Sequence, residues 1–134
     1  MIVKQVSVFV ENTVGRLADL TKILTDNNID LKASTIAETV DFGILRCIVE
    51  DPEKTVKILV ENGFSASISE VTGVSLEDKP GGLHKVLAVL AEAGIAVNYI
   101  YSTIKSAEGK AIIMMKTSDA AKAEEVLKAS GVEL

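Results

Sequence analysis

The sequence has little cysteine and histidine and no tryptophan. It contains one cysteine, Cys47, and one histidine, His84, among 134 residues. A single cysteine excludes an internal disulfide, and neither residue type is numerous enough to build a structural zinc, iron–sulfur or multi-histidine metal site. We therefore expect no metal and no cofactor. The cysteine usage also fits a reducing, cytoplasmic location.

Aromatic residues and runs of basic residues are scarce as well. Three phenylalanines and two tyrosines offer few of the stacking surfaces on which readers of single-stranded nucleic acid depend. Fourteen basic residues face nineteen acidic ones, for a net charge of -5, and no stretch of lysine or arginine interrupts that balance. We therefore expect no nucleic-acid partner.

The sequence also lacks a segment typical of a membrane span or a secretion signal. Residues 86–104 carry one charge, Glu92, and approach the length of a membrane span. Gly94 and Asn98 divide this stretch into a half with helical periodicity and a half with strand periodicity, which indicates two buried elements. The first residues show no basic leader, continuous apolar region or cleavage site. We expect a cytoplasmic protein that does not contact membranes.

Aliphatic residues in alternating and helical patterns make up most of what is present. Hydrophobic residues account for 48% and charged residues for 25%, which is the composition of a folded globular protein. The patterns of the first half predict a strand–helix–strand–strand–helix–strand order. That order is typical of a ferredoxin-like layer of two helices on a four-stranded antiparallel sheet. The predicted strands are 2–10, 29–39, 42–50 and 64–71, and the predicted helices begin at Arg16 and Pro52 and end before Asn27 and Gly63.

The second half repeats the first at an offset of 66 residues, the separation of Gly15 and Gly81. Other matches at this offset are Glu11 with Glu77, Leu17 with Leu83, Leu24 with Leu90, Ile29 with Ile95, and Gly43 with Gly109. Gly63 meets Gly131 at an offset of 68, which predicts two extra residues where 118–122 opens the last helix. The second copy is expected as a strand from about 71, a helix at 82–93, strands at 95–105 and 110–117, a helix at 119–130 and a short C-terminal strand.

The duplication predicts an α+β protein of two ferredoxin-like domains in tandem, residues 1–70 and residues 71–134. Each would have an antiparallel sheet with its helices on one face. Because such small domains bury a limited fraction of their surface and expose sheet edges, we expect the two copies to join edge to edge or the chain to form a homodimer.

The two strand-to-helix loops, ENTVGRL at 11–17 and EDKPGGL at 77–83, are the best candidates for a ligand site. Glycine lets the backbone approach a ligand, and the free N–H groups of a first helical turn favour an anion such as an amino-acid carboxylate. Asn12 or Asp78, or a carbonyl group on a neighbouring strand, could accept a hydrogen bond from the ligand's ammonium group. The alternative is that glycine and a capping side chain serve only the local turn; the occurrence of the loop in both copies favours the ligand site.

Both halves resemble ACT domains, the small-molecule-sensing modules found in aspartate kinase, chorismate mutase and prephenate dehydrogenase. The loops resemble the family's Asn/Asp-x-Pro-Gly-x-Leu turn, followed by an amphipathic helix ending in NNIDL or AGIAV and by a glycine that opens the third strand, Gly43 or Gly109. The resemblance covers essentially the whole chain. The first copy departs from the pattern in having Val14 where the family often has proline, which loosens that turn.

The resemblance implies that an amino acid lies where this loop of one domain meets the second strand of a partner domain. Carried over to this sequence, the candidate ligand-binding residues are Asn12, Val14, Gly15, Arg16, Ile36 and Glu38 in the first copy, and Asp78, Pro80, Gly81, Gly82, Asn98, Tyr99, Ile100 and Tyr101 in the second. Two side chains have alternative interpretations. The two tyrosines share one face of their strand and either fill the core between sheet and helices beside Val97 or line the pocket. Arg16 either pairs with a ligand carboxylate or is solvated.

No arrangement of residues indicates catalysis. His84 falls in the first turn of a predicted helix, where it is expected to face solvent, and Cys47 lies in an alternating strand as a small buried hydrophobe. No nucleophile elbow or phosphate-binding loop is present, so we expect no catalytic residue and no enzyme activity. The favoured hypothesis is a regulatory protein that binds an amino acid and signals to a partner enzyme or regulator. The alternative is a ligand-free assembly module that pairs through sheet edges, and a small ferredoxin-like enzyme is the third hypothesis.

Overall fold

The computed structural model describes residues 1–134, which form six β-strands and four α-helices. The chain divides into two compact units. The N-terminal unit consists of Lys4–Ser69, and the C-terminal unit consists of Glu70–Leu134 together with Met1–Val3. Strand β4 (Ser65–Glu77) contributes residues to both units, as expected from a sequence that continues from one strand into the next without a linker.

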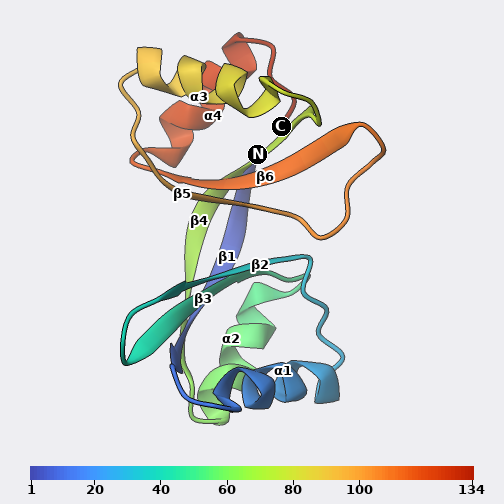
Figure 1. The fold of residues 1–134 in the computed structure, drawn as a ribbon, viewed down its shortest axis with the longest axis vertical. Coiled ribbons are helices and arrows are strands. Elements are labelled where there is room, and N and C mark those ends of the chain that lie inside the picture. Colours follow the sequence, from blue (N-terminus) through green and yellow to red (C-terminus); the bar gives the residue numbers. More distant parts are fainter. The chain divides into compact units, whose positions relative to one another are not determined.

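In the N-terminal unit, two helices cover one face of an antiparallel sheet (Figure 1). The strands are ordered β2-β3-β1-β4, with β1 at the centre paired to β3. Residues of β1, β3 and both helices close an aliphatic core in which Val6, Val8 and Leu20 are fully buried. The elements are β1 (Ile2–Glu11), α1 (Arg16–Asp26), β2 (Ala33–Glu38), β3 (Phe42–Ile48), α2 (Pro52–Glu61) and the first residues of β4.

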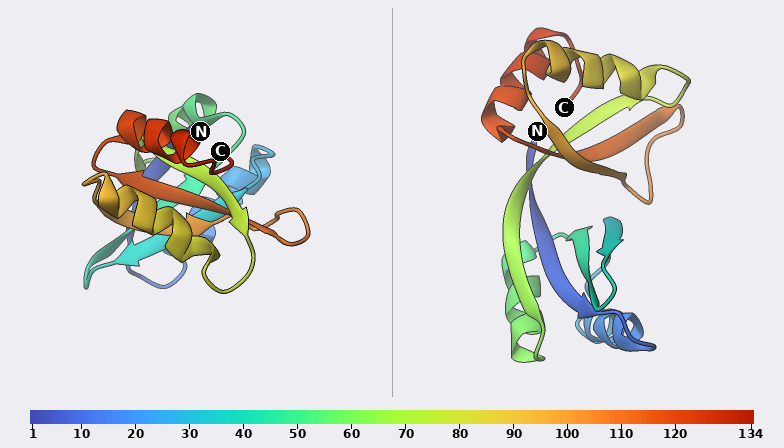
Figure 2. Two further views of the ribbon diagram at one scale, coloured as in Figure 1. Left: turned by 90° about the horizontal axis from the view of Figure 1, so that it is seen from above. Right: turned by 60° about the vertical axis from the view of Figure 1, so that its left-hand side comes forward.

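The C-terminal unit repeats this arrangement, and its two helices also cover one face of the sheet (Figure 2). Its strands are ordered β4-β6-β5, and the core again unites helix and sheet residues such as Val74, Leu90 and Met115. The remaining elements are α3 (Gly82–Glu92), β5 (Val97–Ser102), β6 (Lys110–Thr117) and α4 (Ala120–Ala129). The predicted fold class, two ferredoxin-like α+β domains in tandem, is confirmed.

The second helix of each unit begins with the same cap. The carboxylate of Asp51 accepts a hydrogen bond from the backbone N–H of Lys54, and that of Asp119 from the backbone N–H of Lys122, both at 3.0 Å. Aspartate at this position satisfies a donor that the helix cannot pair internally. The caps are 68 residues apart, the offset predicted from Gly63 and Gly131.

The two extra residues of the second copy do not lie where the sequence comparison placed them, at 118–122. Val10 pairs with Gly43 in the N-terminal unit, and its counterpart Leu76 pairs with Ala111 in the C-terminal unit. Ala111, not Gly109, therefore corresponds to Gly43, and the offset is already 68 where β6 begins. The insertion lies in the connection between β5 and β6, where Gly109 takes a positive φ of 73°. The match of Gly43 with Gly109 was wrong because Gly109 lies in the β5–β6 connection, whereas Gly43 lies within β3 and pairs with Val10.

The predicted C-terminal strand is reduced to one bridge, between Ser75 and Glu133. Further along β4, the backbone of Gly73 exchanges hydrogen bonds with Met1, whose ammonium group donates to the Gly73 carbonyl at 2.9 Å and whose carbonyl accepts from the Gly73 N–H at 2.7 Å. The first residues of the chain thus lie beside β4, where a longer C-terminal strand would otherwise have paired.

The apolar stretch 86–104 is divided between two elements, α3 and β5. None of the four helices is both long enough and apolar enough to span a membrane.

Candidate functional site

The loops that lead into α1 and α3 share a glycine conformation and a hydrogen-bond pattern. Each contains an αL glycine directly before the helix: Gly15 has φ 85° and ψ -11°, and Gly81 has φ 91° and ψ -13°. This conformation is readily open only to glycine. The hydrogen bonds also repeat at the offset of 66: Thr13 N–H to Glu11 and Lys79 N–H to Glu77, Arg16 N–H to Thr13 and Gly82 N–H to Lys79, and Asp19 N–H to Gly15 and Lys85 N–H to Gly81.

No side chain caps either helix at this end. In α2 and α4 an aspartate performs that role, so the glycine turns leave first-turn N–H groups to solvent or to a ligand. The arrangement suits a carboxylate, which accepts hydrogen bonds from such groups.

In the N-terminal unit, a cavity of about 350 Å³ lies beside this turn. It brings together three residues predicted from the sequence, Asn12 of the loop with Ile36 and Glu38 of β2. The side-chain nitrogen of Asn12 donates to the Thr39 carbonyl at 3.3 Å, which ties the loop to the β2–β3 turn. The full lining is Val10, Glu11, Asn12, Thr13, Leu17, Ile36, Glu38 and Gly43.

The other three candidates of this copy lie outside that lining. Val14 is fully exposed, and Gly15 shapes the turn. Arg16 is turned toward its own unit: its guanidinium carbon lies 4.0 Å from the centre of the Phe64 ring, and its Nε donates to Glu11 at 2.7 Å. The predicted pairing of Arg16 with a ligand carboxylate therefore competes with bonds that the side chain already makes.

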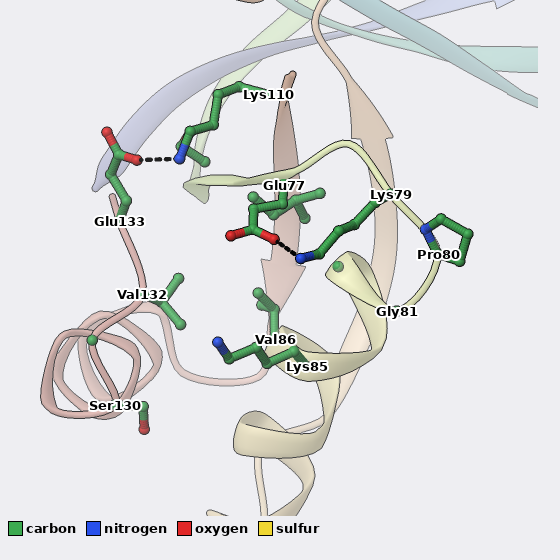
Figure 3. Close-up of a pocket in the computed structure, with 14 residues that line it drawn as sticks. Glu77, Lys79, Pro80, Gly81, Lys85, Val86, Lys110, Ser130, Val132 and Glu133 are labelled. Carbon is green, nitrogen blue, oxygen red and sulfur yellow. Dashed lines mark hydrogen bonds and ion pairs between the residues drawn. The ribbon is translucent and has the colours of Figure 1, made fainter. Parts of the chain in front are cut away.

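The C-terminal unit has a larger cavity, of about 440 Å³, between the start of α3 and the segment after α4 (Figure 3). Pro80, Gly81 and Gly82 of the predicted set line it, whereas Asp78 does not. Three lysines, Lys79, Lys85 and Lys110, lie around it together with residues 75–77, Val86 and residues 130–133. We call it the lysine cavity.

Two acidic residues partly balance the charge of the lysine cavity. Lys79 pairs with Glu77, and Lys110 pairs with Glu133 at 3.1 Å (Figure 3). The hydrogen bond from Lys79 and its positive charge lower the pKa of Glu77, and the charges of Lys85 and Lys110 act in the same direction. Three ammonium groups thus act on one carboxylate, and the lysines outnumber the acids in the lining.

The candidates on β5, which are Asn98, Tyr99, Ile100 and Tyr101, line neither cavity. A β-bulge at Asn98 explains the position of the tyrosines. Val97 pairs with Thr117 and Tyr99 with Lys116, so two residues of β5 face one step of β6. The bulge turns Tyr99 to the opposite face from Val97.

The tyrosine rings do not fill the core between sheet and helices. Tyr101 pairs with Met114, while the neighbouring Met115 belongs to the core beneath the helices. The two tyrosines therefore lie on the helix-free face, with ring centres 6.4 Å apart and planes at 25°. The core interpretation of these side chains was wrong because the sequence gives no sign of the bulge.

Sequence reasoning missed Lys85, Lys110 and residues 130–133 of the lysine cavity. A signal was present in the repeat, because Lys85 stands at the position of Asp19 and Gly82 at that of Arg16. Such a reversal of charge between copies of one turn indicates different surroundings.

The residues considered for chemistry lie apart from both cavities. His84 is exposed on α3, and Cys47 is 1% exposed within the core of the N-terminal unit. No group of three or more histidine, cysteine, aspartate and glutamate side chains is arranged to hold a metal ion.

Comparison with known proteins gives the same architecture. Residues 1–133 match the family described as an ACT domain pair. The solved structure of protein BT0572 from Bacteroides thetaiotaomicron is 43% identical to this chain with a TM-score of 0.93, over 99% of this chain and 91% of that one. The regulatory subunit of aspartate kinase from Thermus thermophilus shares the fold at 16% identity and a TM-score of 0.71, over 96% of this chain and 90% of that one. The corresponding subunit from Thermus flavus has 16% identity and a TM-score of 0.65, over 94% and 88%. None of the curated proteins matches the chain.

Proposed function

This chain belongs to the family of paired ACT domains, and on that basis we propose that it is a cytoplasmic, non-catalytic regulatory protein that binds an amino acid. One observation carries the proposal. The same uncapped glycine turn is built twice, and each copy opens a helix beside a cavity of its own unit. Both cavities fall in the range of roughly 300–1,000 Å³ typical of small-molecule sites.

The N-terminal cavity contains groups for each part of an amino acid. The free N–H groups of the first turn of α1 would bind the carboxylate. Because the Asn12 nitrogen is used by the β2–β3 turn, its side-chain oxygen is available to accept a hydrogen bond from the ammonium group, and Glu38 adds a negative charge. Leu17 and Ile36, which are 42% and 46% exposed, provide an apolar wall for the ligand's side chain.

Occupancy would be transmitted through assembly. Ile36 and Glu38 lie on β2, which pairs only with β3 and therefore presents a free edge in the N-terminal unit. A second copy of the chain could pair at that edge and meet the loop and its ligand. A ligand that contacts both copies stabilises the homodimer over other arrangements, and a partner enzyme or regulator that distinguishes these states would respond to it.

Thermal-shift screening and isothermal titration of the full chain with the twenty amino acids test the proposal. We expect at least one amino acid to raise the melting temperature at millimolar concentration, because a ligand that binds only the folded state stabilises it. Ile36→Ala should weaken that binding. Val60→Ala is the matched control, since Val60 is similarly exposed, at 53%, but lies on α2 away from the cavity. A panel in which no amino acid stabilises the protein would refute the proposal.

The free edges of β2 and β5 favour one alternative, a ligand-free assembly module. Unpaired backbone groups along an edge strand are able to pair with another chain without any ligand. Light scattering and thermal shift together separate the two functions. An assembly module has the same oligomeric state and melting temperature with and without amino acids, whereas a sensor changes one or the other when the ligand is added.

A further inference from the structure

The space that forms the lysine cavity is filled by an arginine in the N-terminal unit. At the repeat offsets, Arg16 corresponds to Gly82 and Phe64 to Val132. The Arg16 guanidinium lies over the Phe64 ring and binds Glu11, whose counterpart Glu77 lines the lysine cavity. The arginine side chain therefore contacts Glu11 and Phe64, whose counterparts Glu77 and Val132 line the lysine cavity.

In the C-terminal unit, smaller residues replace the two side chains that fill this space. Gly82 has no side chain, and Val132 is smaller than a phenylalanine. The two turns share the glycine conformation and the hydrogen-bond pattern, but the carbonyl of Glu77 lies closer to Gly82 than a residue with a Cβ would allow. The lysine cavity, with a volume of about 440 Å³, thus lies where smaller residues stand at the positions of Arg16 and Phe64.

The charge around this space is also reversed between the two units. In the N-terminal unit the guanidinium lies between two carboxylates, with Glu11 at 2.7 Å and Asp19 at 3.9 Å. In the C-terminal unit, Lys85 replaces Asp19. A wall that holds a cationic side chain in one unit therefore favours an anion in the other.

Lys85 differs from the other two lysines of the cavity in its bonding. Lys79 and Lys110 each pair with a glutamate, whereas the ammonium group of Lys85 makes no hydrogen bond or ion pair. Figure 3 shows its side chain extending from α3 toward the segment that carries Ser130 and Val132. An ammonium group in this position has three donors to offer a ligand.

We propose that the lysine cavity binds a small organic or inorganic anion, with a carboxylate or phosphate group held by Lys85. Lys79 and Lys110 would supply further positive charge, and Leu76, Val86 and Val132 would contact the ligand's apolar part. The proposal rests on the proposed function only in that the ligand lies at the glycine turn of the C-terminal unit. It further specifies that the ligand is an anion. It also places this site in the C-terminal unit alone, because Arg16 fills the equivalent space in the N-terminal unit.

Isothermal titration of the full chain with succinate, inorganic phosphate and alanine tests the site. Succinate and phosphate represent the carboxylate and phosphate sources, and alanine represents a neutral amino acid. We expect one of the two anions to bind with a stoichiometry of one per chain. Lys85→Gln should weaken that binding at least about tenfold, the effect of losing a hydrogen bond to a charged group. Lys57→Gln removes the same charge from an exposed position on α2 and should leave the binding unchanged.

Val132→Phe is a second, independent variant. It introduces the residue that the N-terminal unit has at this position and should weaken anion binding by occupying the cavity, with circular dichroism as the check on folding. Failure of both anions to bind at millimolar concentration, or an equal loss in Lys85→Gln and Lys57→Gln, would overturn the anion site. Binding of alanine that persists in Lys85→Gln, without binding of either anion, would also overturn it but leave the proposed amino-acid sensor intact.

Discussion

The α-carbon of Gly82 lies so close to the carbonyl oxygen of Glu77 that a methyl group added to it would overlap that oxygen. At the same position in the N-terminal unit, Arg16 carries a full side chain. The turn into α3 is therefore closed more tightly than the turn into α1, and glycine at this position permits the contact.

Gly82→Ala should consequently destabilise the protein by about 1–3 kcal/mol, because either the backbone or the start of α3 must move. Urea unfolding measures the change. His84→Ala, at an exposed position two residues further along α3, is the control and should change stability by less than about 0.5 kcal/mol. Equal free energies of unfolding for the two variants would show that the turn accommodates a methyl group without loss of stability.

Substitutions at Gly15 and Gly81 test the effect of backbone conformation without a steric clash. A Cβ on either residue would meet no atom within 4 Å, but both glycines have a positive φ. Alanine at either position should therefore cost about 1–2 kcal/mol through conformation and not through collision. Asparagine tolerates the left-handed region better, so Gly15→Asn and Gly81→Asn should cost less than the alanine variants in the same urea experiment. If alanine and asparagine are equally costly, conformation is not the cause.

These glycine turns also show what could be predicted from the sequence. A left-handed turn before a helix requires glycine in both copies, so Gly15 and Gly81 revealed the repeat and the fold. Gly109 misplaced the insertion because a glycine in the sequence does not show whether it lies in a turn, as Gly109 does, or within a strand, as Gly43 does. The bulge at Asn98 adds one residue to a strand without any distinctive residue type, so the face of Tyr99 and Tyr101 could not be predicted.

The cavities were predictable in part for a related reason. Asn12, Ile36 and Glu38 meet because the fold brings the first loop beside β2, and a family resemblance conveys that arrangement. The lysine cavity exists because Gly82 and Val132 are too small to fill the space beside the turn into α3. Recognising it required the positions of Arg16 and Phe64 in the other unit.

Leu59 and Val60 are neighbours on α2 with opposite surroundings. Leu59 is fully buried in the core of the N-terminal unit, whereas Val60 is 53% exposed. Leu59→Ala should cost about 2–5 kcal/mol, through lost burial and the cavity left behind. Val60→Ala should stay within about 0.5 kcal/mol, because it removes little buried surface. Thermal or urea unfolding measures the difference, and equal stabilities of the two variants would contradict this placement of α2.

Cys47 lies in the same core, and burial raises the pKa of its thiol from 9.0 to about 11. The thiolate is the reactive form of cysteine, so the folded protein should react slowly with a thiol reagent at pH 8 and the urea-unfolded protein rapidly. Similar rates in the two states would show that the thiol is accessible in the folded protein.

The same shift in pKa makes stability depend on pH above the neutral range. Well below pH 9 the thiol is almost entirely protonated in both states. Between pH 9 and pH 11 the unfolded chain loses this proton while the folded chain retains it, so the unfolded state is favoured as the pH rises. The loss should approach about 2–3 kcal/mol at pH 11. Urea unfolding across this range, with Cys47→Ala as the reference, isolates the contribution, because the lysines and tyrosines titrate in both proteins. The wild-type curve should fall more steeply than that of Cys47→Ala, and parallel curves would contradict the burial of an ionisable thiol at this position.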